Sequence, residues 1–288
     1  MDHRNDSGAP VAEPHWLVAK AKALFGSKAG SHARIMRDKQ RQEPASSDAP
    51  PIVPEHDAVL RELTSNQYAF IDLGCGTGTS IDHCQRRFNA APGLGIDYTK
   101  TEVLSARAQG YAVYWCNFLD QSLPNRCVGF VSMLDTLEHL PADISINEVL
   151  AHVAKAARDF LFIRHPSFEP DDIAQLEALG LKIGWTDWTG HSNPMSVADF
   201  RHAFETLGWR DYVIIPHMFL HDTSSEHIVP IECPTDTTRY DVAIHRSKPF
   251  SRFERPIAGK FDIFVRLDPQ MPDHLWNRIS NIEGWEAQ

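Results

Sequence analysis

A run of alternate glycines near residue 75 constrains this chain more than any other stretch. Residues 68–73 form a short apolar segment typical of a buried strand, which ends at Gly74, Gly76 and Gly78. The polar, amphipathic segment 80–88 then has the pattern of a helix. Glycine at every second position frees the backbone angles and lets a ligand approach without meeting a Cβ. The stretch therefore predicts a strand, a tight turn that cradles a ligand, and the start of a helix.

The spacing of these glycines separates two classes of ligand. A dinucleotide-binding turn has a third glycine three residues after the second, but Thr79 stands at that place. Asp72 lies inside the end of the strand, and a carboxylate there disfavours a pyrophosphate and favours a cationic ligand. A tight strand-to-helix connection that binds nothing is the alternative interpretation of the same residues.

Composition and charge exclude several classes of protein. The 288 residues with 42% hydrophobic content suffice for one large domain with additions. A net charge of −10 disfavours binding to nucleic acid or to an anionic membrane, so we expect a small-molecule or protein substrate. The five cysteines include no C-x-x-C pair, which argues against a disulfide framework or a zinc site. With no signal-peptide pattern and no membrane-spanning apolar run, we expect a cytoplasmic protein.

The chain alternates strand and helix patterns five times before a helix and two further strands. We predict strands at 68–73, 93–97, 111–116, 128–134, 160–163, 211–215 and 261–267, and helices at 58–63, 80–88, 145–157 and 197–207, with another from residue 99. This order predicts an α/β fold, a Rossmann-like seven-stranded sheet with helices on both faces.

The sequence divides into three segments. Residues 1–54 hold a short amphipathic helix at 15–25 and a linker, either a solvated tail or a lid over a substrate. Residues 55–270 form the main domain, with a long insertion near 216–260. Residues 271–288 are a tail that we expect to form a closing helix.

Two motifs make the chain resemble the class I S-adenosylmethionine-dependent methyltransferases of the small-molecule type. One is the Asp-x-Gly-x-Gly-x-Gly run from Asp72, and the other is Leu-Glu-His-Leu-Pro at 137–141, just after the fourth predicted strand. The resemblance covers roughly residues 55–270 and implies an antiparallel last strand. The Pro-Pro-aromatic and Pro-Cys motifs of DNA methyltransferases do not occur at this place.

The resemblance implies S-adenosylmethionine as cofactor and a set of residues that contact it. Asp97 ends the second strand, at the interval from which an acid reaches a ribose, although aspartate is also favoured as a helix cap. Asn117 takes the place that holds the adenine amino group, with Asp120 as its rival and turn formation as the alternative. The implied cofactor-binding residues are Asp72, Gly74, Cys75, Gly76, Gly78, Asp97, Tyr98, Asn117, Phe118 and Leu134.

Three histidines are the candidates for catalysis. The methyl group of a sulfonium is already activated, so catalysis depends mainly on positioning the acceptor against it. A general base assists where the acceptor holds a proton. His191, His165 and His139 lie on segments expected at the mouth of the site, and each can also be structural. Asp135, Glu138 and His139 have the i, i+3, i+4 spacing of a metal site, but most relatives use this segment without metal, and we predict none.

These observations predict a methyltransferase that acts on a small molecule of natural-product or sugar type, at an O or N acceptor. A nicotinamide-dependent oxidoreductase is one alternative, and a non-catalytic binding subunit with the same fold is another. Binding of the cofactor separates the three. The sequence does not indicate an oligomeric state.

Overall fold

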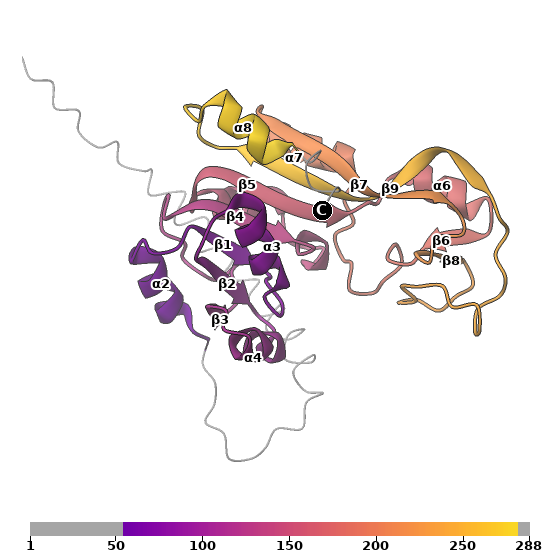
Figure 1. The fold of residues 1–288 in the computed structure, drawn as a ribbon, viewed down its shortest axis with the longest axis horizontal. Helices are drawn as coiled ribbons and strands as arrows, with labels where there is room; N and C mark the ends of the chain where they lie inside the picture. Colours follow the sequence, from indigo (N-terminus) through magenta and orange to yellow (C-terminus); the bar gives the residue numbers. More distant parts are fainter. Residues whose placement is uncertain (1–53, 282–288) are drawn as a thin grey trace, which may run out of the picture. The chain divides into compact units, whose positions relative to one another are not determined.

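The computed structural model describes residues 54–281. The helix and linker predicted within residues 1–54 lie outside the described residues, apart from Pro54, and so do residues 282–288. The described part contains a seven-stranded sheet flanked by helices (Figure 1). None of its helices is long and apolar enough to cross a membrane.

The sheet confirms the predicted fold class. Its order is β3 (Val113–Trp115), β2 (Gly93–Asp97), β1 (Phe70–Leu73), β4 (Val128–Leu134), β5 (Ala157–Pro166), β9 (Arg252–Arg266) and β7 (Tyr212–Asp222). The pairs from β3 to β5 are parallel, while β9 is antiparallel to both β5 and β7. The strand order reverses between β1 and β4, and at such a switch point open sheets bind ligands beyond the carboxyl ends of the strands.

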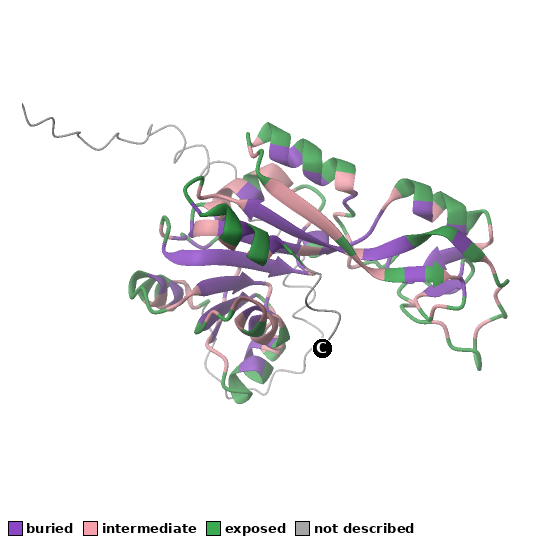
Figure 2. Cartoon of the chain, turned by 45° about the horizontal axis from the view of Figure 1, so that its top comes forward, coloured by how far each residue is buried: buried purple, intermediate pink, exposed green. Residues whose placement is uncertain are grey.

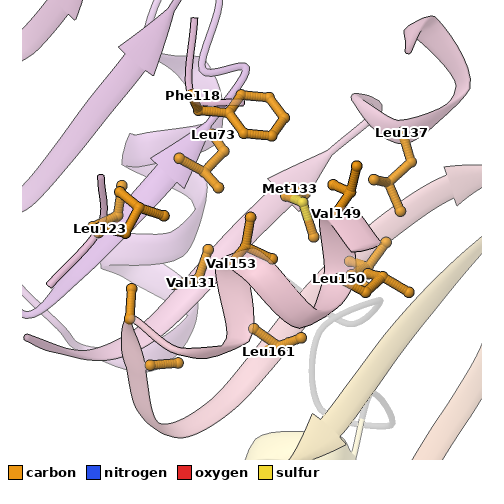
Figure 3. Close-up of a cluster of buried hydrophobic side chains, with 14 of the residues drawn as sticks. Leu73, Phe118, Leu123, Val131, Met133, Leu137, Val149, Leu150, Val153 and Leu161 are labelled. Atoms are coloured by element: carbon orange, nitrogen blue, oxygen red, sulfur yellow. The ribbon is translucent and has the colours of Figure 1, made fainter. Parts of the chain in front are cut away.

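Two hydrophobic cores lie on opposite faces of the sheet, because alternate residues of a strand point to opposite sides. Along β4, Val131 and Met133 join one core, while Phe130 and Leu134 join the other. Figure 2 shows the inner strands of the sheet as buried, the edge strand β7 as mostly intermediate, and the outer faces of the helices as exposed. Figure 3 shows the first core, where α5 packs its leucine and valine side chains onto β4. The first face carries α2 (His56–Thr64), α5 (Ile146–Ala154) and α7 (Val197–Thr206), and the second α3 (Thr79–Phe88), α4 (Lys100–Ala108) and α8 (Asp273–Ser280).

The second core is built from aromatic rings on neighbouring strands. Phe130 stacks between Phe70 and Phe160, with ring centroids 4.7 Å apart on each side. Phe162 stacks on Phe264 at 4.8 Å, and Phe88 of α3 meets the row edge-on. Stacked rings in this range add to the energy of burial itself, so the row joins strands from β1 to β9.

An outer lobe has a third core of its own. It comprises α6 (Pro170–Glu177), the two-stranded sheet of β6 (Leu181–Ile183) and β8 (Ile228–Pro230), and the far ends of β7 and β9. Its α6, β6 and β8 were not predicted from the sequence.

Several strand boundaries differ from the prediction. β7 continues to Asp222 and β9 begins at Arg252, so much of the stretch near 216–260 that we predicted as an insertion is strand. Pro216 hides this pattern, because proline is tolerated in a strand only at places such as the sheet edge, which β7 occupies. β5 begins at Ala157, which we placed in the preceding helix, and it includes Arg164 and His165.

The aromatic row gives a first prediction, on stability. Phe162 is fully buried, so Phe162→Ala leaves a cavity between β5 and β9 and should lower the free energy of unfolding by about 3–5 kcal/mol. Phe219→Ala is the matched control, because that ring is 44% exposed on β7 and its loss should change stability by less than about 1 kcal/mol. Urea denaturation of the three proteins measures both values. Equal losses in the two variants would contradict the assigned packing.

Candidate functional site

A cavity of about 440 Å³ opens at the switch point between β1 and β4. It contains four of the predicted cofactor-binding residues: Gly74, Cys75, Gly76 and Leu134. The sequence prediction missed the other lining residues, which are Thr77, Thr79, Ser80, His83, Glu102, Asp135 and Arg164.

Two signals in the sequence point to the missed residues. Asp135 follows β4 directly and Arg164 lies near the carboxyl end of β5, where chemistry gathers in such sheets. Thr79 and Ser80 precede His83 by four and three positions, the spacings that bring side chains together on the surface of a helix such as α3. Helical spacing beside a glycine turn therefore finds cavity residues that a strand-end rule alone does not.

The glycine turn is shaped by what lies next to each glycine. Gly74 has φ +74°, and a Cβ there would come within 2.6 Å of the Thr136 side chain. Thr136 in turn donates a hydrogen bond from Oγ1 to the Leu73 carbonyl at 3.0 Å. Gly76 has φ +51°, but a Cβ there would meet nothing within 4 Å. The backbone at Gly74 is thus fixed against β4, while Gly76 faces open space that a ligand can fill.

Asp97 holds this turn from the end of β2. Its Oδ2 accepts a hydrogen bond from the Gly76 N–H at 2.9 Å, and its Oδ1 accepts one from the Thr99 N–H at 2.7 Å. The carboxylate is buried beside the cavity wall and also anchors the entry to α4. Each carboxylate oxygen accepts more than one hydrogen bond, so Asp97 keeps acceptor capacity for a ligand.

Asp72 has a different role from the predicted one. It is fully buried and does not belong to the cavity lining. Ser132 Oγ donates to its Oδ1 at 2.6 Å, and the Ser80 hydroxyl bonds its Oδ2. Burial raises the pKa of Asp72 to about 6, against the opposing effect of the two serine hydroxyls. Asp72 therefore supports the turn from behind, and its predicted direct contact with a ligand does not fit this position.

The predicted adenine corner is a closed turn. Asn117 Nδ2 donates to Asp120 Oδ2 at 3.0 Å, and its Oδ1 accepts from the Leu119 N–H at 3.2 Å. Phe118 is buried in the first core, and Tyr98 is 39% exposed beside Asp97. The turn-forming interpretation of Asn117 fits these contacts, and neither Tyr98, Asn117 nor Phe118 lines the cavity.

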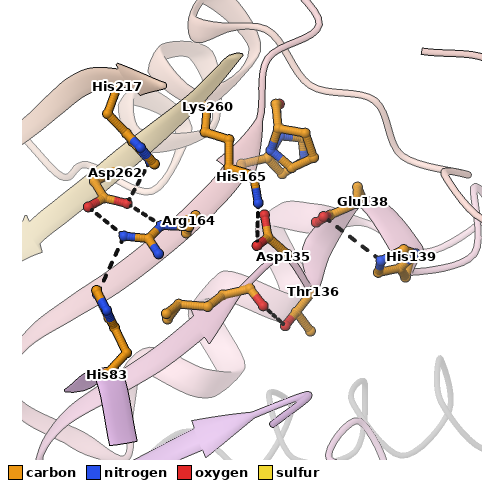
Figure 4. Close-up of polar contacts among 12 residues, drawn as sticks. His83, Asp135, Thr136, Glu138, His139, Arg164, His165, His217, Lys260 and Asp262 are labelled. Atoms are coloured by element: carbon orange, nitrogen blue, oxygen red, sulfur yellow. Dashed lines mark hydrogen bonds and ion pairs between the residues drawn. The ribbon is translucent and has the colours of Figure 1, made fainter. Parts of the chain in front are cut away.

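β9 supports the cavity from behind, because two of its charged residues pair with residues that line it (Figure 4). Arg164 makes a two-pronged ion pair with Asp262, with contacts of 2.7 and 3.0 Å, and His217 Nε2 lies 3.2 Å from the same carboxylate. Burial alone would raise the pKa of Asp262, but hydrogen bonds from His217 and Arg164 lower it well below the usual range. Lys260 Nζ likewise contacts Asp135 Oδ2 at 2.7 Å. Both cations are thus neutralised by partners.

Two of the three predicted histidines lie together, and neither of them lines the cavity. His139, on the short helix η1 (Leu137–His139), and His191 have ring centroids 4.9 Å apart. Trp188 packs against His191 at 4.8 Å. Burial lowers the pKa of His191. Beside them Glu138 is buried, and this burial together with the nearby Asp135 raises its pKa to about 8.

His165 lies inside the core. Its ring is fully buried against Phe168 and Phe200, and its Nδ1 is 2.7 Å from the Pro166 carbonyl. Burial lowers its pKa to about 4. These contacts fit the structural interpretation of His165, because a ring without exposed surface does not contact a bound acceptor.

Comparison with known proteins finds similarity in solved structures alone. No family model and no curated protein sequence matches the chain. A methyltransferase from Archaeoglobus fulgidus, described as dependent on S-adenosylmethionine, matches with 17% identity and TM-score 0.47, over 73% of this chain and 91% of that one. A possible histamine N-methyltransferase from Thermotoga maritima matches with 11% identity and TM-score 0.46, over 86% and 100%.

Magnesium protoporphyrin IX methyltransferase from Synechocystis matches with 14% identity and TM-score 0.42, over 87% of this chain and 99% of that one. Similarity at these levels concerns the fold alone and does not indicate a function. The antiparallel direction of β9 agrees with the antiparallel last strand that the resemblance to class I methyltransferases implied.

Asp72 gives a second prediction, on pH dependence. Its pKa in the folded protein, about 6, lies above the ordinary value near 4, so its contribution to stability is present at low pH and is lost as pH rises through 6. The substitution Asp72→Asn removes this pH-dependent contribution. Wild-type stability relative to the variant should fall by up to about 3 kcal/mol between about pH 4 and pH 7.

Urea denaturation across this pH range tests the prediction. The control is Asp171→Asn, because Asp171 is exposed in the first turn of α6 and should give a flat difference from wild type. A flat difference for Asp72→Asn as well would mean that Asp72 is solvated or ionised throughout the range.

Proposed function

We propose that the protein is an S-adenosylmethionine-dependent methyltransferase that acts on a small molecule, of natural-product or sugar type, at an O or N acceptor. The observation that carries the proposal is the turn at Gly74–Gly76, which opens into a cavity at the switch point and is held by Asp97 from β2. Gly76 leaves free space beside a buried carboxylate with acceptor capacity. A ligand with a ribose and a flat base suits that pair of features.

The charges of the cavity favour a cationic ligand over a dinucleotide. Glu102 lines it, whereas the other charged lining residues, Arg164 and Asp135, are paired with Asp262 and Lys260. A pyrophosphate needs unpaired donors and cations, and a sulfonium needs nearby carboxylates. Thr79 in place of the third glycine points the same way. The nicotinamide-dependent alternative is therefore the weaker one.

The residues of this chain would position the cofactor and promote removal of the acceptor's proton. S-adenosylmethionine brings a methyl group already activated by its sulfonium. Gly74, Gly76 and Asp97 would bind and orient the cofactor, and the cavity residues at the ends of β4 and β5 would exclude water. We assign the acceptor side to His139 and His191, which promote loss of the acceptor's proton, with His191 foremost because its lowered pKa keeps the imidazole neutral at pH 7.

Cofactor binding by the full-length chain gives the third prediction. Calorimetry should show binding of S-adenosylmethionine and no binding of NADH. Asp97→Ala removes a charge-assisted acceptor and should cost about 2–4 kcal/mol, a loss of about 30-fold to 700-fold in affinity. Asp97→Asn keeps one neutral acceptor oxygen and should lose less.

Asp171→Ala is the control and should bind as wild type does, because Asp171 is exposed on α6. Circular dichroism checks that each variant is folded. Binding of NADH in place of S-adenosylmethionine would favour the oxidoreductase. Binding of neither would favour the non-catalytic subunit and overturn the proposal.

A further inference from the structure

Glu138, His139 and His191 gather three metal-binding side chains close to Asp135, which lines the cavity. One ligand atom from each lies within 4.8 Å of the other two. We propose that this cluster binds a divalent transition-metal ion, with Zn²⁺ as the best match. Two imidazoles and one carboxylate are a ligand set that Zn²⁺ and Fe²⁺ prefer, whereas Mg²⁺ and Ca²⁺ prefer oxygen ligands.

Both imidazoles are held in the tautomer that a metal requires. His139 Nδ1 lies 3.1 Å from the Gly190 carbonyl, and His191 Nδ1 lies 2.8 Å from the Trp185 carbonyl. A carbonyl oxygen only accepts hydrogen bonds, so each Nδ1 must carry the proton. Each Nε2 then keeps its lone pair. A backbone carbonyl behind the ring is the usual support of a metal-binding histidine.

The carboxylate of Glu138 needs a partner that the described residues do not supply. Its side chain is 1% exposed, and its Oε2 has no hydrogen-bond partner in the described part of the chain. Its Oε1 lies 3.9 Å from His139 Nε2, which is too far for a hydrogen bond. Figure 4 shows the two side chains turned toward one another. A buried oxygen without a partner is costly, and a bound cation removes that cost.

The backbone brings the third ligand to the other two. The Asn193 N–H donates to the Glu138 carbonyl at 3.0 Å, and Asn193 Nδ2 donates to the Pro141 carbonyl at 3.0 Å. With the bond between His139 and Gly190, these contacts dock the loop 190–193 onto η1. His191 is therefore held against a helix that lies 52 positions earlier in the chain.

The three ligand atoms lie slightly farther apart than they would around a bound Zn²⁺. Ligand atoms around a tetrahedral Zn²⁺ lie about 3.4 Å apart, given bonds of about 2.0–2.2 Å. Rotation of side chains brings atoms within 4.8 Å to that spacing. Three protein ligands leave the fourth position of a tetrahedral Zn²⁺ open, and a further ligand can reach it because the His139 side chain is 33% exposed.

This cluster differs from the i, i+3, i+4 set of Asp135, Glu138 and His139 that the sequence suggested. Asp135 Oδ2 is engaged by Lys260 on β9, and His191 takes its place as the third ligand. An acceptor hydroxyl bound at the open position would lose its proton more readily than in water. In this arrangement the histidines act on the acceptor through the ion. This effect on the acceptor rests on the proposed function, but the metal site itself does not.

Metal titration of the full-length protein tests the site. Protein dialysed against a chelator should bind one equivalent of Zn²⁺ by calorimetry, and Co²⁺ in its place should give visible absorption. His191→Ala and Glu138→Gln should each lose at least about 10-fold to 100-fold in Zn²⁺ affinity. Asp135→Asn should keep the wild-type affinity, which separates this cluster from the set based on sequence spacing.

His202→Ala is the matched control, because His202 is exposed on α7. Thermal unfolding checks that every variant is folded. Absence of Zn²⁺ binding to wild type, or equal binding in His191→Ala and wild type, would overturn the site. Binding of S-adenosylmethionine to the metal-free protein is measured separately, so that failure of the metal site leaves the proposed methyltransferase function standing.

Discussion

The contact of the Asp72 carboxyl group with two serine hydroxyls is the interaction on which the site depends. Ser132 lies beside Asp72 in the register of β4 on β1, and Ser80 belongs to the first turn of α3. One side chain thus joins two strands and a helix directly behind the glycine turn. Because the carboxyl is fully buried, any movement of the turn would break hydrogen bonds that water cannot replace. The open face at Gly76 exists because the opposite face of the turn is held in this way.

Electrostatic pairing decides which charges the cavity presents. The cations nearest to it, Arg164 and Lys260, are bound to Asp262 and Asp135, and these pairs join β5 and β4 to β9. An ion pair removed from water is costly unless its remaining donors and acceptors are satisfied, and Asp262 meets this condition with His217 as a second partner. The paired cations leave the carboxylate of Glu102 to set the local charge of the lining. The same residues therefore hold the outer strands in place and tune the cavity.

The sequence alone predicts the elements near the glycine turn better than the outer ones. Continuous apolar runs bounded by turn residues gave β2 and β4 with their observed bounds, because a strand buried on both faces has a simple pattern. The far ends of β7 and β9 carry Pro216 and several charged residues, so their pairing depends on partners that no local pattern shows. Site residues divide in the same way. Gly74 and Gly76 follow from spacing, whereas the burial of Asp72 and His165 and the meeting of His139 with His191 depend on tertiary packing.

The place of β9 in the sheet has a consequence for how the chain reaches its native state. β9 is the last strand of residues 54–281, yet it inserts between β5 and β7, and it carries both Lys260 and Asp262. Its contacts to Asp135 and Arg164 span 125 and 98 positions of the chain. Pairings over such separations form slowly, because a long loop must close first. During synthesis, a nascent chain that ends before residue 252 has the glycine turn but lacks the partners of Asp135 and Arg164, so the cavity reaches its final form only after β9 has been made.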